Sequence, residues 1–495
     1  MSWMLLIYVP LMALGCLFLY DILQKEHSIL RTYPVIGHIR YIAEFFGVYL
    51  RAYFYSRDRE ELPFNRAQRS WIYQASKNVD STVAFGSTRD LRPIGTMYFV
   101  DAPFPIQYED AVETRAVTFG PYCANPFTTR SLINISAMSY GSISENAILA
   151  LSQGAKKAGI WLNTGEGGIS AFHLESGCDL VAQIGTAKYG YRTPDGKLSD
   201  EKLKEAAAYP QVRMFEVKLS QGAKPGKGGL LPGVKVTPEI ARIRGIPPYE
   251  DSVSPNRFPE IANPSQLLDF IQHVREVTGK PVGFKVVLGN YDWLDDLCIE
   301  IVRRGIESAP DFITLDGKEG GTGAAPLTLM DYVGLPIRES LPALVDLLMG
   351  YDLKDRIKVI ASGKLITPDM VVWALAVGAD FVNSARGFLF ALGCIQALRC
   401  NRNTCPTGIT THNPWLMRGL DPTSKAVRVY HYVKNLEHEV GVVCHSCGVS
   451  EPRELNRNHV RIVTEHGDSV ALAQIYPPKD LGWKLEEFVR KKTDK

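Results

Sequence analysis

The sequence predicts an α/β fold, namely a (β/α)8 TIM barrel with an N-terminal membrane helix and cap segment and with C-terminal helices. Three observations predict this architecture. From about Ser131 onward, short apolar runs alternate with helix-length amphipathic segments, as in repeated βαβ units. Eight such runs are present without an early G-x-G-x-x-G motif, which favours a closed barrel over a doubly wound open sheet. The first 20 residues carry no charge.

The same pattern divides the chain into five expected segments. They are a transmembrane anchor (1–22), an interfacial aromatic segment (23–60), an N-terminal cap (61–130), the barrel (131–416) and a C-terminal helical extension (417–495).

The uncharged N-terminal segment, Trp3 to Tyr20, is long enough for a helix that crosses about 30 Å of hydrocarbon. A cleaved signal peptide is the alternative, but the segment lacks a basic start and an A-x-A-like cleavage site. Basic residues follow the segment, and such residues stay on the cytoplasmic side of a membrane. They are Lys25, Arg31, Arg40, Arg51, Arg57 and Arg59. We therefore expect a single-pass membrane protein with its barrel in the cytoplasm.

Three further segments flank the barrel. Tyr41–Tyr55 is aromatic and contains Arg51, which fits a helix in the membrane interface, and a packed core helix fits equally well. Glu61–Arg130 has many turns and short extended runs, which predict a cap over one barrel end. Amphipathic segments at Thr423–Glu439 and Pro452–Asn458 predict helices outside the barrel.

The eight apolar runs are the candidate strands. Almost all end in loops of Gly, Ser, Lys or Glu, and such barrels assemble their chemistry from the loops at the carboxyl ends of the strands. The candidate strands are Leu132–Ala137, Ile160–Asn163, Leu180–Ile184, Met214–Leu219, Val282–Val287, Phe312–Leu315, Lys358–Ile360 and Phe381–Asn383.

Composition narrows the range of partners. The 495 residues are 45% apolar, and Lys+Arg 55 against Asp+Glu 53 leaves a formal charge of +2. The chain lacks the excess of basic residues that is typical of a nucleic-acid-binding protein, so the expected partners are small molecules. Nine cysteines are too few for a disulfide scaffold of this size, which favours a reducing compartment.

Three of these cysteines, Cys394, Cys400 and Cys405, form a C-x5-C-x4-C segment that ends in Pro406. Three thiolates on one short segment match the ligands of a three-iron cluster. A structural zinc site requires four ligands, and no fourth Cys or His lies within the segment. Cys444 and Cys447 form a C-x2-C pair that fits a redox pair, a zinc half-site, further cluster ligands or two ordinary reduced thiols.

Glycine-rich loops follow three of the late strands. The loop GKEGGTGAAP allows backbone N–H groups to approach an anion, and loops after strands seven and eight are the usual phosphate site of this barrel. The alternative is that these glycines only shorten turns. The candidate anion-binding residues are Gly320, Gly321, Thr322, Gly323, Ser362, Gly363 and Arg386.

Charged and polar groups gather after the second and fourth strands. NTGEGG holds Glu166 between glycines, and the fourth strand leads into Lys218, Gln221 and Lys224, with Arg244 further along. Several cations at a barrel mouth would attract a di-acid. Lysines such as Lys227 and Lys235 fit a solvated surface, whereas Lys218 and Lys285 lie within apolar strands.

These motifs resemble the FMN-binding synthase domain of glutamate synthases. ISAMSYGSIS, NTGEGG, QGAKPGKGGLLPGVKV, GGTGAAPLT and ALGCIQALRCNRNTCPTGI follow that family's order between Asn134 and Leu416. The overall plan is most similar to stand-alone, membrane-anchored proteins of this family. The resemblance implies hydride transfer from reduced FMN to the imine of 2-oxoglutarate and ammonia, which gives glutamate.

The resemblance also implies roles for the matched residues. Lys224 and Arg244 would bind substrate carboxylates with Gln221 beside them, and Glu166 and Lys218 would be acid–base or positioning groups. Lys285, Ser139 and the Gly320–Gly323 loop would contact FMN, and the three clustered cysteines would hold a 3Fe-4S centre. The electron donor stays open among ferredoxin, a nicotinamide-oxidising subunit and a membrane quinol.

Some positions depart from the family pattern. Lys227 and Leu230 stand where the family usually has Glu and Gln, and Arg386 replaces a small polar residue. The chain begins with Met1 where large glutamate synthases begin with a nucleophilic cysteine, so we expect free ammonia as nitrogen source. Two alternatives therefore stay open. One is an FMN oxidoreductase of another 2-oxo acid or an N-substituted amino acid, and the other is a membrane-bound electron-transfer subunit without its own substrate.

Overall fold

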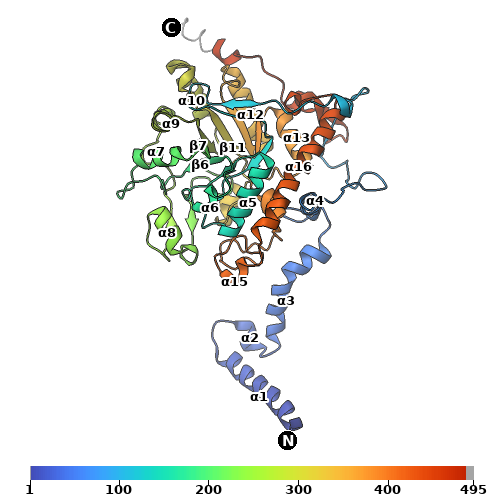
Figure 1. Ribbon diagram of the computed structural model, residues 1–495. Coiled ribbons are helices and arrows are strands. Elements are labelled where there is room, and N and C mark those ends of the chain that lie inside the picture. The colour runs from blue at the N-terminus through green and yellow to red at the C-terminus, as the bar shows by residue number, and fades with distance from the viewer. Residues whose placement is uncertain (1, 487–495) are drawn as a thin grey trace. The chain divides into compact units, whose positions relative to one another are not determined.

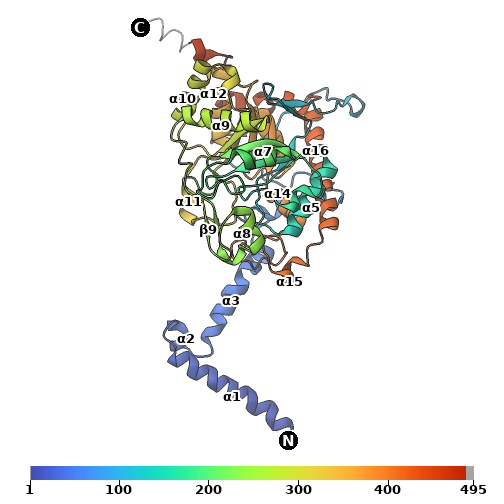
Figure 2. The same ribbon diagram turned by 60° about the vertical axis from the view of Figure 1, so that its left-hand side comes forward.

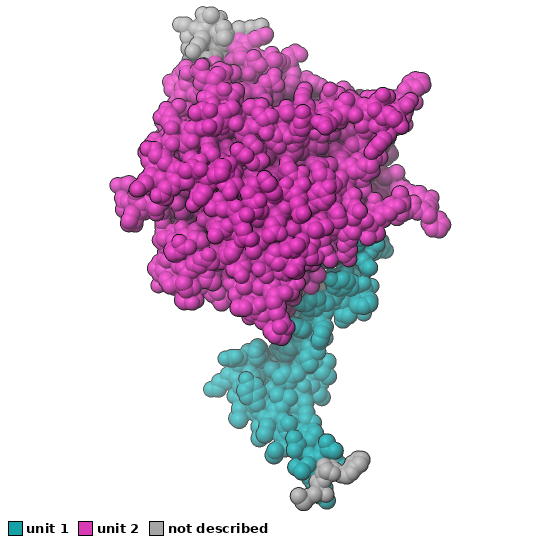
Figure 3. All heavy atoms as spheres, viewed as in Figure 1, with its two compact units in different colours: residues 1–70 teal, residues 71–495 magenta. Residues whose placement is uncertain are grey.

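The computed structural model describes residues 2–486. The described residues fall into two compact units, which are divided between Ser70 and Trp71 (Figure 3). The first unit contains the apolar N-terminal helix and the aromatic segment. The second contains the barrel and everything after it.

Eight parallel strands close into a barrel in the second unit (Figure 1). Each strand pairs with the next in chain order, and β13 returns to pair with β4, so the sheet has no open edge. All eight strands coincide with predicted ones, and the closed barrel excludes the doubly wound sheet. They are β4 (Ile133–Ile135), β5 (Leu162–Asn163), β6 (Leu180–Ile184), β7 (Val212–Lys218), β10 (Val282–Val286), β11 (Phe312–Asp316), β12 (Lys358–Ser362) and β13 (Phe381–Ser384).

Helices surround the strands (Figures 1 and 2). Local sequence fixes their ends. In α9 the Asn263 side chain accepts a hydrogen bond from the Gln266 N–H, Pro264 occupies the first turn, and Gly279 ends the helix with φ 68°. The surrounding helices are α5 (Glu145–Ala158), α6 (Ala171–Leu174), α7 (Asp200–Ala208), α9 (Pro264–Thr278), α10 (Asp292–Arg304), α12 (Ile337–Gly350), α13 (Pro368–Val377) and α14 (Arg386–Leu392).

An aromatic cluster closes the amino-terminal end of the barrel. The hairpin of β2 (Val117–Phe119) and β3 (Phe127–Thr129) inserts Phe119 and Phe127 between side chains at the start of the barrel strands. The Phe119 ring stacks on Phe381 at 4.9 Å and meets Trp161 edge-on at 5.9 Å. Burying such rings contributes several kcal/mol to stability. We call this cluster the floor of the barrel.

The C-terminal extension contains the expected helix and two strands that were not expected. The helix is α16 (Pro422–Ser446), which packs against α5 (Figure 2). Instead of one helix at 452–458 there are two short 3-10 turns, at Pro452–Glu454 and Arg457–His459. Strand β14 (Val460–Val463) pairs with β15 (Ser469–Ala471) and with β1 (Met97–Phe99), far away in sequence. Local patterning cannot reveal a three-residue strand whose partner is so distant.

The first unit is a series of helices. Helix α1 (Ser2–Leu23) contains a segment, Met4–Leu23, of 20 residues that is long and apolar enough to cross a membrane, and a signal sequence would meet the same criteria. After it come α2 (Ser28–Thr32), α3 (Gly37–Leu50) and a π-helical turn, Arg51–Tyr55. Phe46 and Phe54 are exposed here, so the aromatic segment is not a packed core helix within its own unit.

Candidate active site at the carboxyl end of the barrel

The ends of β5, β7 and β11 bring three functional groups together. Lys218 Nζ lies 3.1 Å from Glu166 Oε1 and donates a hydrogen bond of 2.8 Å to Gln221 Oε1. The Gln221 amide in turn donates to the Gly321 carbonyl at 3.2 Å. This chain of contacts joins loops from three strands, as expected for the mouth of such a barrel.

Glu166 lies in a space that glycines provide. A Cβ atom on Gly229 would stand 2.4 Å from Glu166 Oε1, and one on Gly185 would stand 2.6 Å from the Glu166 Cβ. Burial would raise the pKa of Glu166, but Lys218, Lys224 and Arg244 outweigh burial and hold that pKa below its ordinary value. The Glu166 carboxylate is therefore ionised at neutral pH.

Lys224 and Arg244 come from one insertion, residues 221–255, between β7 and α9. It contains β8 (Leu230–Leu231), the turn Gly233–Lys235, α8 (Pro238–Arg244) and β9 (Ser252–Val253). Helix α8 begins at a Thr237 cap and ends at Gly245, and this places Arg244 in its last turn. The insertion therefore carries both predicted carboxylate-binding cations.

Both of these cations are buried. The Arg244 guanidinium donates to Ser139 Oγ at 3.3 Å, to Ser252 Oγ at 3.2 Å and to the Tyr140 carbonyl at 3.2 Å. Its Nε atom is buried without a hydrogen-bond partner among the described residues. Burial, assisted by Lys218, lowers the pKa of Lys224 to about 8. Such cations suit an anionic ligand.

A second pair of charges lies at the adjacent strand ends. Lys285 on β10 is the register neighbour of Lys218, and its Nζ lies 3.6 Å from Asp316 Oδ2 at the end of β11. Asp316 also accepts a hydrogen bond of 2.8 Å from the Gly222 N–H. Asp316 thus ties Lys285 to the insertion, a role that no sequence pattern indicated.

The glycine-rich loops pack against one another. A Cβ atom on Gly222 would lie 1.9 Å from the Gly317 carbonyl oxygen, and one on Gly320 would lie 2.6 Å from Asp316 Oδ1. The Ser362 carbonyl accepts from the Gly317 N–H at 2.8 Å, and Gly363 has φ 127°. At these positions glycine is required for loop packing. Anion binding by the loops stays a prediction.

Arg386 connects the glycine loop to the cysteine segment. Its guanidinium donates to the Thr322 carbonyl at 2.7 Å and lies 3.7 Å from the Cys400 Sγ. Lys235 also reaches this segment, because its Nζ donates to the carbonyls of Ser142 at 2.6 Å and Cys400 at 3.3 Å. Lys235 is only 1% exposed, so the expectation of a solvated side chain is wrong. The insertion folds over this lysine, and its apolar flanks in GVKV were a local signal of burial.

The clustered cysteines are free thiols. Cys394 and Cys400 are half-buried and Cys405 is buried, with its Sγ 3.3 Å from Thr407 Oγ1. Tyr73 donates to the Cys394 carbonyl at 2.5 Å. Across residues 2–486 no group of three or more His, Cys, Asp or Glu side chains is arranged to hold a metal ion. Ligation by these thiols therefore stays a prediction.

Cys444 and Cys447 are buried at the end of α16. Burial raises the pKa of Cys444 to about 12, which leaves little of the reactive thiolate. The four interpretations considered for this pair stay predictions. Elsewhere in the barrel, His173 is buried in α6 and its Nδ1 contacts Ser170 Oγ at 2.8 Å.

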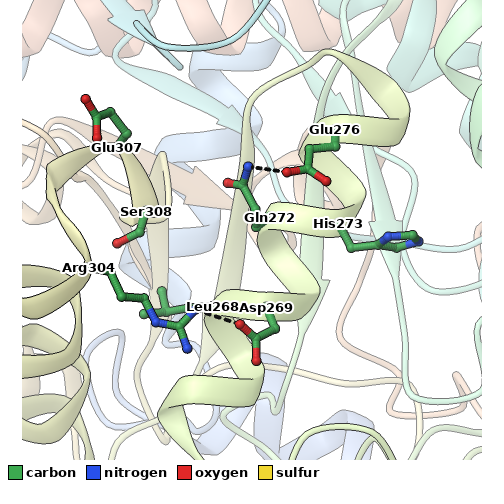
Figure 4. A pocket seen from close by; sticks show the side chains of 8 residues that line it. All are labelled: Leu268, Asp269, Gln272, His273, Glu276, Arg304, Glu307 and Ser308. Carbon is green, nitrogen blue, oxygen red and sulfur yellow. Dashed lines mark hydrogen bonds and ion pairs between the residues drawn. The ribbon is translucent and has the colours of Figure 1, made fainter.

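Two surface pockets lie away from the predicted residues. The first has a volume of about 340 Å³ and lies between α9 and α10 (Figure 4). Its polar side chains bind one another: Arg304 pairs with Asp269 at 2.6 Å, and Gln272 donates to Glu276 at 2.7 Å. Another, of about 420 Å³, is lined by residues of the cap, α5 and α16. None of the predicted site residues lines either pocket.

Comparison with known proteins identifies the family. A family model described as the conserved region in glutamate synthase matches residues 105–450. The chain belongs to the glutamate synthase family. It is thus a glutamate synthase-like oxidoreductase.

Relatives within the family differ in how much they share. The glutamate synthase large subunit-like protein YerD of Bacillus subtilis is 41% identical over 94% of this chain and 95% of its own length. The archaeal glutamate synthase (NADPH) of Methanocaldococcus jannaschii is 33% identical over 67% of this chain, and the match covers 61% of that relative. A large subunit-like protein of Rhizobium meliloti is 28% identical over 79% of the chain and 88% of that relative.

Proposed function

We propose that the protein is an FMN-dependent oxidoreductase of glutamate synthase type, which reduces the imine of 2-oxoglutarate and ammonia to glutamate with electrons delivered through an iron–sulfur cluster. One observation carries the substrate part of this proposal. Lys218 pairs with the Glu166 carboxylate at 3.1 Å, and the buried cations Lys224 and Arg244 are near enough to lower the pKa of that carboxylate further. An electron-transfer subunit without its own substrate would not need this arrangement.

The roles of these residues follow from their chemistry. Arg244 and Lys224 would hold the carboxylates of a di-acid, because both are buried cations from one insertion. Reduction of a C=N bond adds a hydride to carbon and a proton to nitrogen. Lys218, whose ammonium contacts both Glu166 and Gln221, would donate the proton in that step. Glu166 would hold the Lys218 ammonium in place through their ion pair.

The residues at the mouth fit FMN. Asn134 Nδ2 on β4 and Asn383 Oδ1 on β13 are buried in the barrel without hydrogen-bond partners among the described residues, so a ligand could satisfy them. The proposed contacts to FMN are Ser139, Lys285, Gly320, Gly321, Thr322, Gly323, Ser362, Gly363 and Arg386. When bound, FMN supplies the hydride, and the protein contributes orientation and charge.

The cysteine segment fits a cluster better than a single ion. Its three thiols carry cationic neighbours in Arg386 and Lys235, which would offset the negative charge of thiolate ligands. An iron–sulfur cluster is larger than one ion, so its ligands stand further apart than those around zinc. Cys394, Cys400 and Cys405 would be its ligands, and Arg386 contacts both this segment and the glycine loop.

The decisive experiment is anaerobic turnover of the dithionite-reduced, purified protein with a panel of oxo acids and amines. We expect 2-oxoglutarate with ammonium to reoxidise the flavin and to form glutamate stoichiometrically. Reoxidation by a different oxo acid or by an amine would support an FMN oxidoreductase of another 2-oxo acid or an N-substituted amino acid. That alternative is considered because half-exposed Leu230 departs from the family pattern. If only redox proteins reoxidise the flavin, the result would support a membrane-bound electron-transfer subunit without its own substrate.

We further propose that Met4–Leu23 anchors the protein in a membrane, with the barrel on the cytoplasmic side and the aromatic segment in the interface. Support comes from the exposed apolar side chains of α1 and from the basic residues that follow it. The proposed partners are 2-oxoglutarate, ammonia, an electron donor such as ferredoxin or a redox subunit, and the membrane.

A further inference from the structure

A carboxyl group lies inside the barrel directly beneath the mouth. Glu216 on β7 is 1% exposed, between the apolar floor and the charged strand ends. Its Oε1 accepts hydrogen bonds from Asn163 at 2.8 Å and from Gln183 at 2.7 Å. Its Oε2 accepts from Thr314 at 2.6 Å. Among the described residues no cation stands within ion-pair distance of Glu216, so three neutral donors alone stabilise this buried group.

Each of the three donors lies next to a strand end that carries a residue of the candidate site. Asn163 also accepts from the Gly165 N–H at 3.0 Å, immediately before Glu166. Gln183 precedes by two residues Gly185, whose backbone packs on Glu166. Thr314 likewise precedes by two residues Asp316, which pairs with Lys285. Because alternate residues of a strand share a face, Glu216 holds β5, β6 and β11 in register below the site.

The charge of Glu216 also bears on the mouth. Lys218 follows it by two residues on the same strand, about 7 Å further along, and Lys285 is the register neighbour of Lys218. These lysines already pair with Glu166 and Asp316 at the mouth. A carboxylate below them reduces the positive potential that an incoming anion experiences.

We propose that Glu216 is a positioning residue that lowers the positive potential of the mouth, where Lys218 stands two residues further along the same strand, and so limits how tightly the mouth binds a di-acid. This inference rests on the proposed function, because it assigns the mouth to a dicarboxylate substrate. Ground-state binding that is too tight lowers turnover, since only interactions stronger in the transition state accelerate a reaction. Glu216 would thus lower the affinity for the substrate and raise the rate of turnover.

Two variants separate charge from geometry. Glu216→Gln keeps the shape of the side chain: its oxygen can accept from Asn163 and Gln183, while its amide can donate to the Thr314 hydroxyl, which then accepts. Glu216→Asp keeps the charge but is shorter, so it cannot retain all three contacts. Isothermal titration of the full-length, oxidised protein with 2-oxoglutarate measures the result.

We expect Glu216→Gln to fold and to bind 2-oxoglutarate at least about tenfold more tightly, as the loss of a unit charge about 10 Å from the nearer substrate carboxylate predicts for an effective dielectric constant of about 20. The Michaelis constant should fall and kcat should not rise. The reduction potential of bound flavin should shift in the positive direction, because a negative charge beneath it has been removed. Glu216→Asp should bind within about twofold of the wild type for the same electrostatic reason.

Three outcomes would overturn the inference. They are unchanged affinity in Glu216→Gln, equal tightening in Glu216→Asp, and failure of Glu216→Gln to fold. The proposed function is tested separately by flavin reoxidation in the wild type. If that assay fails while wild type still binds 2-oxoglutarate, the comparison of the two variants remains decisive for Glu216.

Discussion

At the scale of single residues, the informative feature is two buried cations that make no direct ion pair and have Glu166 as their shared carboxylate at longer range. Neither Lys224 nor Arg244 has a carboxylate within ion-pair distance among residues 2–486, and both are at most 5% exposed. An unpaired buried charge is costly, and natural proteins retain one mainly where a ligand compensates it. Substitutions of these two residues therefore test substrate binding most directly.

Arg244→Lys should weaken the use of 2-oxoglutarate by roughly 1–3 kcal/mol in kcat/KM, because an ammonium cannot reproduce the forked contacts of the guanidinium. Flavin content should be unchanged. Arg242→Lys, at an exposed position of the same helix α8, is the matched control and should behave like the wild type. Loss of flavin in Arg244→Lys would place Arg244 in the cofactor site instead.

Lys224 predicts a pH dependence. Its pKa is lowered to about 8, so its charge is present below pH 8 and is lost as the pH rises above that value. Affinity for 2-oxoglutarate, measured by titration calorimetry at pH 7, 8 and 9, should therefore fall across this range. Lys224→Gln should bind 2-oxoglutarate more weakly, and its affinity should change little between pH 7 and pH 9. Lys227→Gln, at an exposed position, should show the same decrease in affinity with pH as the wild type. An identical pH profile in Lys224→Gln would assign the titration to another group.

At the scale of elements, every barrel strand was predictable because each is a short apolar run that ends at polar or glycine residues. The segments at the strand ends that carry Glu166, Lys218 and Gln221 could be located for the same reason. The burial of Lys235 and the contacts of Glu216 could not, since they depend on how an insertion folds back and on which side chains meet across the barrel interior.

The cysteine segment supplies the prediction at this scale. Cys400→Ser should remove the iron of the purified protein, since three protein thiolates leave no spare ligand, while the flavin absorption spectrum remains. Cys178→Ser, at a buried free thiol beside β6, should keep its iron. Total iron analysis and low-temperature electron paramagnetic resonance give the result. Wild-type iron content in Cys400→Ser would show that this segment does not hold a cluster.

At the scale of the whole molecule, the chain separates a largely exposed helical unit from a densely packed barrel. The apolar length of α1 and the barrel pattern were both visible in the sequence. The sheet of β1, β14 and β15 was not, because its strands are short and lie at opposite ends of the second unit.

Deleting residues 1–23 should move the protein from the membrane to the soluble fraction with its flavin retained, because the barrel has its own core. Some binding should persist through the aromatic segment. Ultracentrifugation of cell lysates, followed by flavin measurement, is the test. As a control, full-length protein should stay in the membrane pellet after a high-salt wash, and its release by salt alone would refute a membrane-spanning anchor.

The aromatic floor of the barrel affects how this enzyme can diversify. Phe119, Trp161 and Phe381 fill the end opposite the mouth, so the packing that stabilises the barrel lies away from the candidate site. Changes in the insertion at 221–255 can then alter which molecule is accepted without loosening the scaffold. A lineage could acquire a new substrate through that one stretch of chain, in small steps that each leave a folded protein.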